Sequence, residues 1–185
     1  MGGLLEMILK SQNGAAVEQL ARNFGVSGQD ATRAIAGMLP GLSRGVQSSA
    51  SSPQGLEALA KALGQGQHQQ YLDRPESLGD QSTIQDGNNI LGHILGGKDA
   101  SRQLASQAAA QTGLDVGTLK KMLPAVAAML MGGLSKQEAS TGALRQGSAG
   151  ASDSSAIGAM LTSFLDADKD GSVADDLLGM AKKLF

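Results

Sequence analysis

The chain has 185 residues, of which 41% are hydrophobic and 17% charged, and this balance excludes both an intrinsically disordered and a membrane-embedded protein. The net charge of −2 argues against nucleic acid as the main partner, and the absence of cysteine excludes disulfides, thiolate metal ligands and cysteine nucleophiles. Aromatic residues make up only 2%, so the core must consist of Leu, Ile, Val, Ala and Met, a composition that favours packed helices over sheets.

Residues 1–47 are predicted to form an N-terminal helical hairpin. Residues 1–10 have the pattern of a short amphipathic helix, and no basic leader precedes their apolar run, which argues against a secretory signal. Farther on, Gly25 is expected to stop one helix and Ser27 to cap the next, which carries the sequence Met38-Leu39-Pro40.

Residues 48–85 are predicted to hold one short helix between polar linkers. The stretches 43–55 and 65–86 are rich in small and polar residues, a composition that is typical of flexible connections. The short helix is expected at residues 56–63.

Residues 86–134 are predicted to form a second helical hairpin that resembles the first. Gly113 is the expected helix stop and Asp115 the cap, and the helix that follows carries Met122-Leu123-Pro124. Because the same signals recur in the same order, with apolar residues at helical spacing, they indicate an internal repeat. The Asp86-Gly-Asn-Asn start of this region is interpreted as a helix cap rather than as a metal site.

The longest apolar run, residues 122–134, contains Pro124 and is too short to span a bilayer. Two environments remain open for it: the centre of a helical bundle, which we favour, and a membrane surface, where the lysines at its two ends would face the headgroups. Four methionines in the helical arms are expected in the core, although they could also line an adaptable groove: Met38, Met122, Met129 and Met131.

The chain has two histidines, His68 and His93. His93 stands among apolar residues of a predicted helix, and we expect a partly buried or interface residue rather than a catalyst. Gly92 and Gly96 flank it with a spacing that is typical of close helix packing. No convergent set of acid, base and nucleophile is visible in the sequence, so we do not expect an enzyme.

Residues 135–151 are predicted to be a flexible linker and residues 152–185 a helix-loop-helix. The loop begins Asp166-Ala-Asp-Lys-Asp-Gly-Ser, like the calcium loop of an EF-hand, in which alternating carboxylates converge on one cation and the glycine allows a sharp turn. The predicted Ca²⁺ ligands are Asp166, Asp168, Asp170, Ser172, Asp175 and Asp176.

The end of this loop departs from an EF-hand. Leu177 occupies the place of the bidentate glutamate, so Asp175 or Asp176 would have to close a site of modest affinity. The alternative is that Ser172 and Asp175 form a capping box for the last helix and that the turn needs no ion. We favour a structural calcium site over this alternative.

Three features resemble the YidB-like family of bacterial proteins of unknown function: the paired Met-Leu-Pro helices, the segment 86–97 and the ending 164–179. The aspartate loop also resembles dockerin calcium loops. The family resemblance implies an all-helical, cytosolic bacterial protein without known catalysis, and it supplies no catalytic residues.

We therefore expect an all-α cytoplasmic protein, with two related helical hairpins and a C-terminal helix-loop-helix. Its expected function is non-enzymatic interaction or assembly, through a protein partner or through self-association, with one structural calcium ion. The alternative is a membrane- or envelope-associated stress protein whose helix 122–134 contacts lipid.

Overall fold

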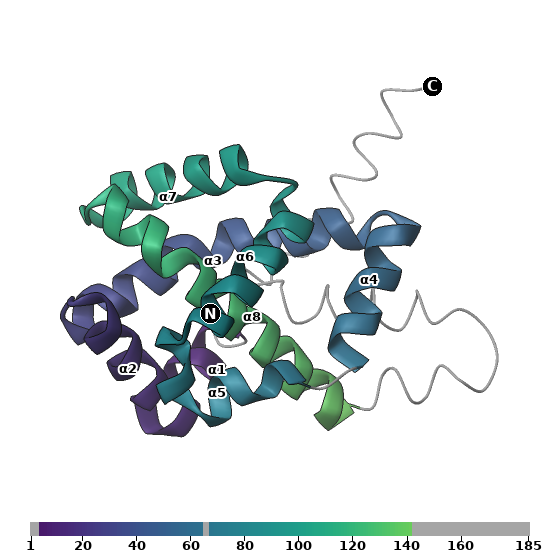
Figure 1. Cartoon of the computed structure of the whole chain (residues 1–185), viewed down its shortest axis with the longest axis horizontal. Coiled ribbons are helices and arrows are strands. Elements are labelled where there is room, and N and C mark those ends of the chain that lie inside the picture. Colours follow the sequence, from purple (N-terminus) through teal and green to yellow (C-terminus); the bar gives the residue numbers. More distant parts are fainter. Residues whose placement is uncertain (1–3, 65–66, 142–185) are drawn as a thin grey trace.

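The computed structural model describes residues 4–64 and 67–141, which form helices joined by short turns (Figure 1). The α-helices are α1 (Leu4–Lys10), α2 (Ala15–Phe24), α3 (Gly28–Ala50), α4 (Pro53–Gly64), α5 (Gln70–Asp73), α6 (Gln81–Leu95), α7 (Lys98–Thr112) and α8 (Val116–Thr141). Short 3-10 segments are η1 (Ser11–Gly14), η2 (Gln67–Gln69) and η3 (Pro75–Gly79). No strand occurs in the described residues, and the predicted all-α class is confirmed.

Helix α8 lies at the centre of the fold and contacts each of α1 to α7. Every residue from Met122 to Ser135 is buried, because other helices cover all sides of this stretch. A helix that is apolar all round needs such an environment. The prediction of a central bundle helix is therefore confirmed, and the prediction that the four methionines belong to the core is also confirmed.

The burial of α8 contradicts the alternative in which residues 122–134 contact lipid, since this stretch has no exposed face. Within residues 4–64 and 67–141, no helix is both long enough and apolar enough to cross a membrane.

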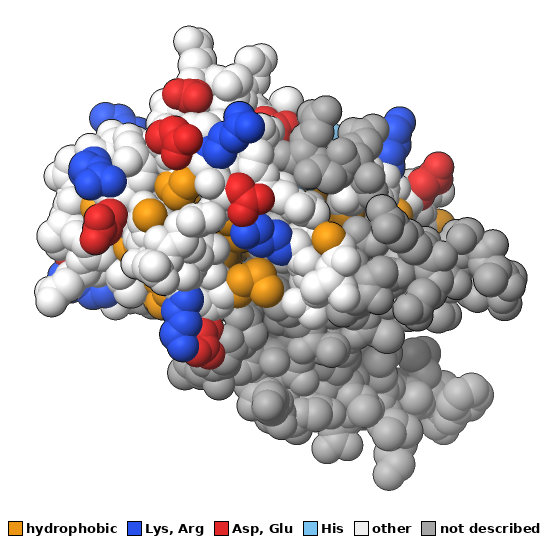
Figure 2. All heavy atoms as spheres, turned by 90° about the horizontal axis from the view of Figure 1, so that it is seen from below, with side chains coloured by type: hydrophobic (Ala, Val, Ile, Leu, Met, Phe, Trp, Pro, Cys, Tyr) orange, Lys and Arg blue, Asp and Glu red, His pale blue; other side chains and the backbone are white. Residues whose placement is uncertain are grey.

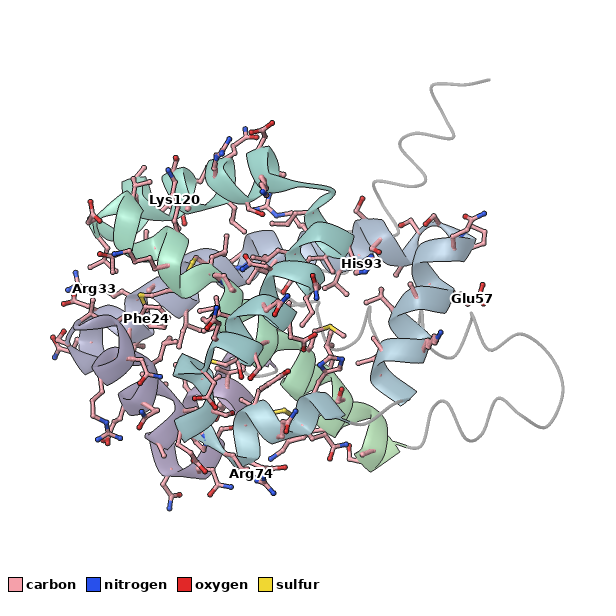
Figure 3. All side chains as sticks on the ribbon, in the orientation of Figure 1. Phe24, Arg33, Glu57, Arg74, His93 and Lys120 are labelled. Carbon is pink, nitrogen blue, oxygen red and sulfur yellow. The ribbon has the colours of Figure 1, made fainter. Side chains whose placement is uncertain are left out.

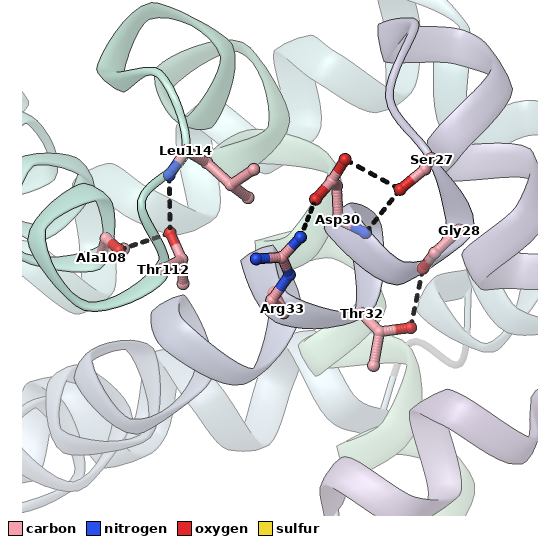
Figure 4. Close-up of polar contacts among 8 residues, drawn as sticks. All are labelled: Ser27, Gly28, Asp30, Thr32, Arg33, Ala108, Thr112 and Leu114. Atoms are coloured by element: carbon pink, nitrogen blue, oxygen red, sulfur yellow. Dashed lines mark hydrogen bonds and ion pairs between the residues drawn. The ribbon is translucent and has the colours of Figure 1, made fainter.

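The first hairpin, α2–α3, forms as its local signals predict. Gly25 ends α2 with φ of 67°, and the Val26 amide donates to the Ala21 carbonyl at 3.0 Å, which closes the last turn. The Ser27 hydroxyl accepts from the Asp30 amide at 3.0 Å and caps α3 (Figure 4). The Ser27 hydroxyl also lowers the pKa of the Asp30 carboxyl below its usual value by donating to it.

The second hairpin, α7–α8, uses the same arrangement. Gly113 ends α7 with φ of 73°, and its amide donates to the Ala109 carbonyl at 2.8 Å. Asp115 accepts from the Thr118 amide at 2.7 Å and caps α8, and this bond lowers the pKa of the Asp115 carboxyl. The predicted glycine stops and helix caps are therefore present in both arms, while the division into hairpin domains and their origin in a duplication remain predictions.

Glycines on α3 bring α6 and α7 close to it. Gly37, Gly41 and Gly45 follow one another at intervals of four residues, so they share one face of the helix. A β-carbon at Gly41 would overlap Leu104 of α7, and one at Gly45 would lie 2.8 Å from the Ile94 carbonyl of α6. The absence of side chains on this face lets both helices pack against the backbone of α3.

The region predicted as linkers is more helical than its composition suggests. Helix α3 continues to Ala50, and α4 begins at Pro53, so the linker predicted at 43–55 is reduced to a turn. The loop predicted at 65–86 contains η2, α5, η3 and the first turns of α6. Residues 135–141 belong to α8 rather than to a linker, and residues 142–185, with the predicted helix-loop-helix, lie outside the described residues.

Candidate functional site

The six predicted calcium ligands, Asp166, Asp168, Asp170, Ser172, Asp175 and Asp176, lie outside the described residues. The calcium site therefore remains a prediction. In residues 4–64 and 67–141, no three His, Asp or Glu side chains are grouped so that they could hold a metal ion.

Within the described residues, the most concentrated polar chemistry is a group of three side chains, His68, Tyr71 and Asp86, which we call the polar cluster. The Tyr71 hydroxyl donates to Asp86 Oδ2 at 2.6 Å, and His68 Nδ1 lies 3.4 Å from the same oxygen. The imidazole and phenol rings have centroids 5.9 Å apart. One carboxylate oxygen thus faces both rings.

Helix packing explains how these three residues meet. Tyr71 and Leu72 are the buried residues of the one-turn helix α5, which packs against α8. Asp86 lies in α6 beside Gly87, at the point where α6 approaches α8 so closely that a β-carbon on Gly87 would overlap the Pro124 carbonyl. The polar cluster therefore lies where α5 and α6 meet the central helix.

Burial and the facing carboxylate determine the protonation of the phenol. Tyr71 is 6% exposed, and burial together with the negative charge and hydrogen bond of Asp86 raises the pKa of its hydroxyl well above the usual value. The phenol is therefore a neutral donor to Asp86. His68 Nδ1 is buried and makes no hydrogen bond within the described residues, although it lies 3.4 Å from Asp86 Oδ2.

Two further contacts join the same segment to the end of α8. The Gln69 side-chain amide donates to the Ser135 carbonyl at 3.2 Å, and Lys136 Nζ lies 2.6 Å from Asp73 Oδ1. A β-carbon on Gly132 would lie 2.8 Å from the His68 carbonyl, so η2 rests directly on the α8 backbone. Residues 67–73 are thus held to both α6 and α8.

Comparison with known proteins gives one match. The family described as bacterial protein of unknown function (DUF937) matches residues 6–137, which is well over half of the chain. The chain belongs to this family. No curated protein and no solved structure matches it. The DUF937 match confirms a bacterial family of unknown function, while the finer resemblance to YidB-like proteins remains a prediction.

The polar cluster falls inside the part of the chain that DUF937 covers. The geometry of this cluster suits a structural role, because its polar groups contact one another across different elements of the fold and so hold these elements together. Asp86 accepts a hydrogen bond from the Tyr71 hydroxyl and faces His68. The Asp86 side chain is 35% exposed. Ser135, the buried serine of the same region, makes no side-chain hydrogen bond within the described residues.

Two sequence predictions about this DUF937 chain are wrong. Asp86 does not cap a helix, because α6 begins at Gln81 and Asp86 lies inside it. A β-carbon on Gly92 or Gly96 would meet nothing within 4 Å, so the predicted close helix packing at these glycines does not occur with a described neighbour. His93 lies between them and is exposed, so of the two positions expected for it only an interface stays a prediction. Figure 3 shows His93 far from Arg74, the residue that follows α5.

Sequence reasoning missed the polar cluster for a physical reason. Tyr71 and Asp86 are 15 positions apart, and their contact depends on how α5 and α6 pack against α8. One signal was available: Tyr71 is the only tyrosine of the chain, and a buried tyrosine needs a hydrogen-bond partner.

Proposed function

We propose that this DUF937 protein is a non-enzymatic helical interaction protein that self-associates, with the outer face of α7 as the contact surface. Helices commonly recognise one another by packing one face against a partner helix. The proposal includes a cytoplasmic location and no nucleic-acid partner.

The observation that supports this proposal is the lack of charge on the outer face of α7 beyond its first turns, which carry Lys98, Asp99 and Arg102. No charged residue occurs from Gln103 to Thr112. The exposed residues of this stretch are Gln103, Ser106, Gln107, Ala110 and Gln111. The centres of protein interfaces are depleted of charged residues, because burying a charge without a partner is unfavourable. Helix α7 also lies at the edge of the described part of the fold (Figure 1).

Other surfaces of the molecule have a different character. Figure 2 shows acidic and basic side chains interspersed over one face, with apolar side chains between them in small groups. On α2, Glu18 and Arg22 form an exposed pair of opposite charges. Among the described residues of this face, Figure 2 shows no continuous basic patch for phosphates, and the net charge of −2 also supports a protein partner over a nucleic acid.

Size-exclusion chromatography with light scattering over a range of protein concentrations tests the proposal. We expect the wild-type chain to form dimers or larger species, and Gln107→Lys to lower the associated fraction because the contact would then bury a charge without a partner. Gln85→Lys, at an exposed position of α6, is the matched control and should leave association unchanged. A wild-type chain that stays monomeric at every concentration, or equal loss in both variants, contradicts the proposal.

The second part of the proposal is that Asp166, Asp168 and Asp170, with Ser172 and either Asp175 or Asp176, bind one calcium ion. Alternating carboxylates repel one another in the absence of a cation, and oxygen ligands at this spacing suit Ca²⁺. The ion would act as a structural clip for the C-terminal segment rather than as a sensor.

Thermal unfolding with calcium and with a chelator tests this site. We expect calcium at millimolar concentration to raise the Tm by about 3–6 °C, the shift for a chain of this size when calcium is present at about ten times the Kd of one site and stabilises the folded state by about 1.4 kcal/mol. Asp168→Ala should abolish the shift, whereas Asp80→Ala, at an exposed carboxylate outside the loop, should retain it. A Tm that calcium leaves unchanged in the wild type contradicts calcium binding.

A further inference from the structure

The connection between α1 and α2 has an unusual backbone. Gln12 and Asn13 have φ of 50° and 56°, and Gly14 follows with φ of 89°, so three successive residues are in the left-handed region. Side chains other than glycine rarely adopt this region, because the β-carbon approaches the following carbonyl. The strain of this turn is therefore greatest at Gln12, since asparagine tolerates the left-handed region better than most residues with a β-carbon, and both residues are exposed.

Asn13 is also the only asparagine of the chain that precedes a glycine. Asn23 lies in α2, and Asn88 and Asn89 lie in α6. All four asparagines are exposed, so exposure does not distinguish them. What distinguishes Asn13 is a strained turn in place of an α-helix and a following residue without a side chain.

From these observations we infer that Asn13 is a site of spontaneous deamidation, a covalent modification that is independent of the proposed function. The Gly14 backbone nitrogen attacks Asn13 Cγ, a new N–C bond forms, and the Cγ–Nδ2 bond breaks. The proton of the attacking nitrogen leaves with the amide group as ammonia, and a five-membered succinimide remains. Water then opens either carbonyl of the ring and gives aspartate or isoaspartate, without any oxidant or reductant.

The backbone explains why the reaction is selective. The attack requires rotation about the Cα–C bond of Asn13, whose ψ is 34° in the turn. In an α-helix the hydrogen-bonded backbone resists this rotation, whereas a short strained turn adopts other conformations readily. Gly14 lacks the β-carbon that would hinder the approach of its nitrogen.

The product changes the start of α2. Gly14 provides no side-chain cap for this helix, and a carboxylate at position 13 would lie next to its N-terminus, where negative charge is favourable. The isoaspartate form adds one backbone atom to a turn that the sequence holds in a strained conformation. Deamidation therefore alters both the charge and the path of the α1–α2 connection.

Peptide mapping of the full-length folded protein tests the inference. The protein is incubated at mildly alkaline pH and digested with trypsin, and cleavage after Lys10 and Arg22 gives peptide 11–22, which contains Asn13 and no other asparagine. We expect this peptide to gain the mass of an amide-to-acid conversion and to elute as separate aspartate and isoaspartate forms. Asn13→Asp supplies the reference for the first form.

The other asparagines are internal controls in the same sample. Asn23 falls in peptide 23–33, and the two asparagines of α6 fall in a third peptide. Conversion at Asn13 at least about tenfold faster than at each of them supports the inference. A smaller ratio, or no isoaspartate form of peptide 11–22, overturns it. Asn13→Gln should remove the signal from that peptide, because glutamine would have to close a larger ring.

Discussion

At the scale of single residues, Tyr71 shows how the fold controls one titratable group. Its hydroxyl is buried and donates to Asp86 at 2.6 Å. Phenylalanine at this position would retain the ring but leave Asp86 without its donor. We expect Tyr71→Phe to lower the free energy of unfolding near neutral pH by about 1–2 kcal/mol, measured by urea denaturation.

The same substitution should change the response to alkali. Because the pKa of Tyr71 is raised in the folded chain, the folded state retains this proton above about pH 10, where an unfolded tyrosine loses it. The folded state then binds more protons, so stability falls as the pH rises, and Tyr71→Phe should lack this contribution. Asp86→Asn, which keeps an acceptor but removes the charge, should show an intermediate pH dependence. If the free energy of unfolding fell equally with rising pH in the wild type and in Tyr71→Phe, the role given to this hydrogen bond would be contradicted.

Gln12 provides a test of the strain in the α1–α2 connection. Glycine adopts φ of 50° without the penalty that a β-carbon brings, although it also has more freedom in the unfolded chain. We expect Gln12→Gly to raise the free energy of unfolding by about 0.5–1 kcal/mol. Gln29→Gly, at an exposed helical position in α3, should instead lower it by a similar amount. If both variants are destabilised alike, the turn is not strained at Gln12.

Local chemistry made some residues predictable from the sequence. Ser27 and Asp115 cap helices through bonds to amides three residues ahead, so short spacing alone identifies them. The contact between Tyr71 and Asp86 has no such local signature, because it requires α5 and α6 to have packed on α8 first.

At the scale of elements, two glycines of α6 have opposite surroundings. A β-carbon at Gly87 would overlap the Pro124 carbonyl of α8, whereas one at Gly92 would meet nothing within 4 Å. We expect Gly87→Ala to lower the free energy of unfolding by about 1–3 kcal/mol, because the two helices must separate. Gly92→Ala should raise it by about 0.5–1 kcal/mol through better helix propensity. Thermal unfolding of both variants measures the difference, and equal effects would show that α6 does not approach α8 at Gly87.

The serine-rich stretch after Val46 shows why composition alone mispredicts a helix end. Polar, small residues are typical of linkers, yet α3 continues to Ala50. The Ser51 hydroxyl donates to the Gln47 carbonyl at 2.9 Å, so a serine satisfies a carbonyl at the helix end. Pro53 then begins α4, a position at which proline is favoured because its missing amide hydrogen would have no helical partner.

At the scale of the whole molecule, the buried character of α8 was visible in the sequence as an apolar run without a polar face. The arrangement of the helices around α8 was not visible, since glycines at Gly41, Gly45 and Gly87 determine which neighbours approach closely. The hydrophobic pattern therefore identifies the central helix, whereas the positions at which neighbouring helices approach each other closely can be identified only from the structure.

Among residues 4–64 and 67–141, the buried hydrophobic core runs from Ile8 to Leu134, and the DUF937 match covers residues 6–137. A fragment of residues 1–141 contains all of these side chains together with the whole of α8. Since burial of this apolar surface is the main source of stability, we expect the fragment to fold alone, with a helical circular-dichroism spectrum and one cooperative thermal transition.

Comparing this fragment with the full-length chain also separates the two proposals about function. The fragment retains α7, so it should self-associate as the full chain does, and Gln107→Lys should weaken both. It lacks the aspartate loop, so calcium should shift the Tm of the full chain and leave that of the fragment unchanged. A fragment that unfolds without cooperativity would show that residues 142–185 supply part of the core. A fragment that responds to calcium would place the ion outside the aspartate loop.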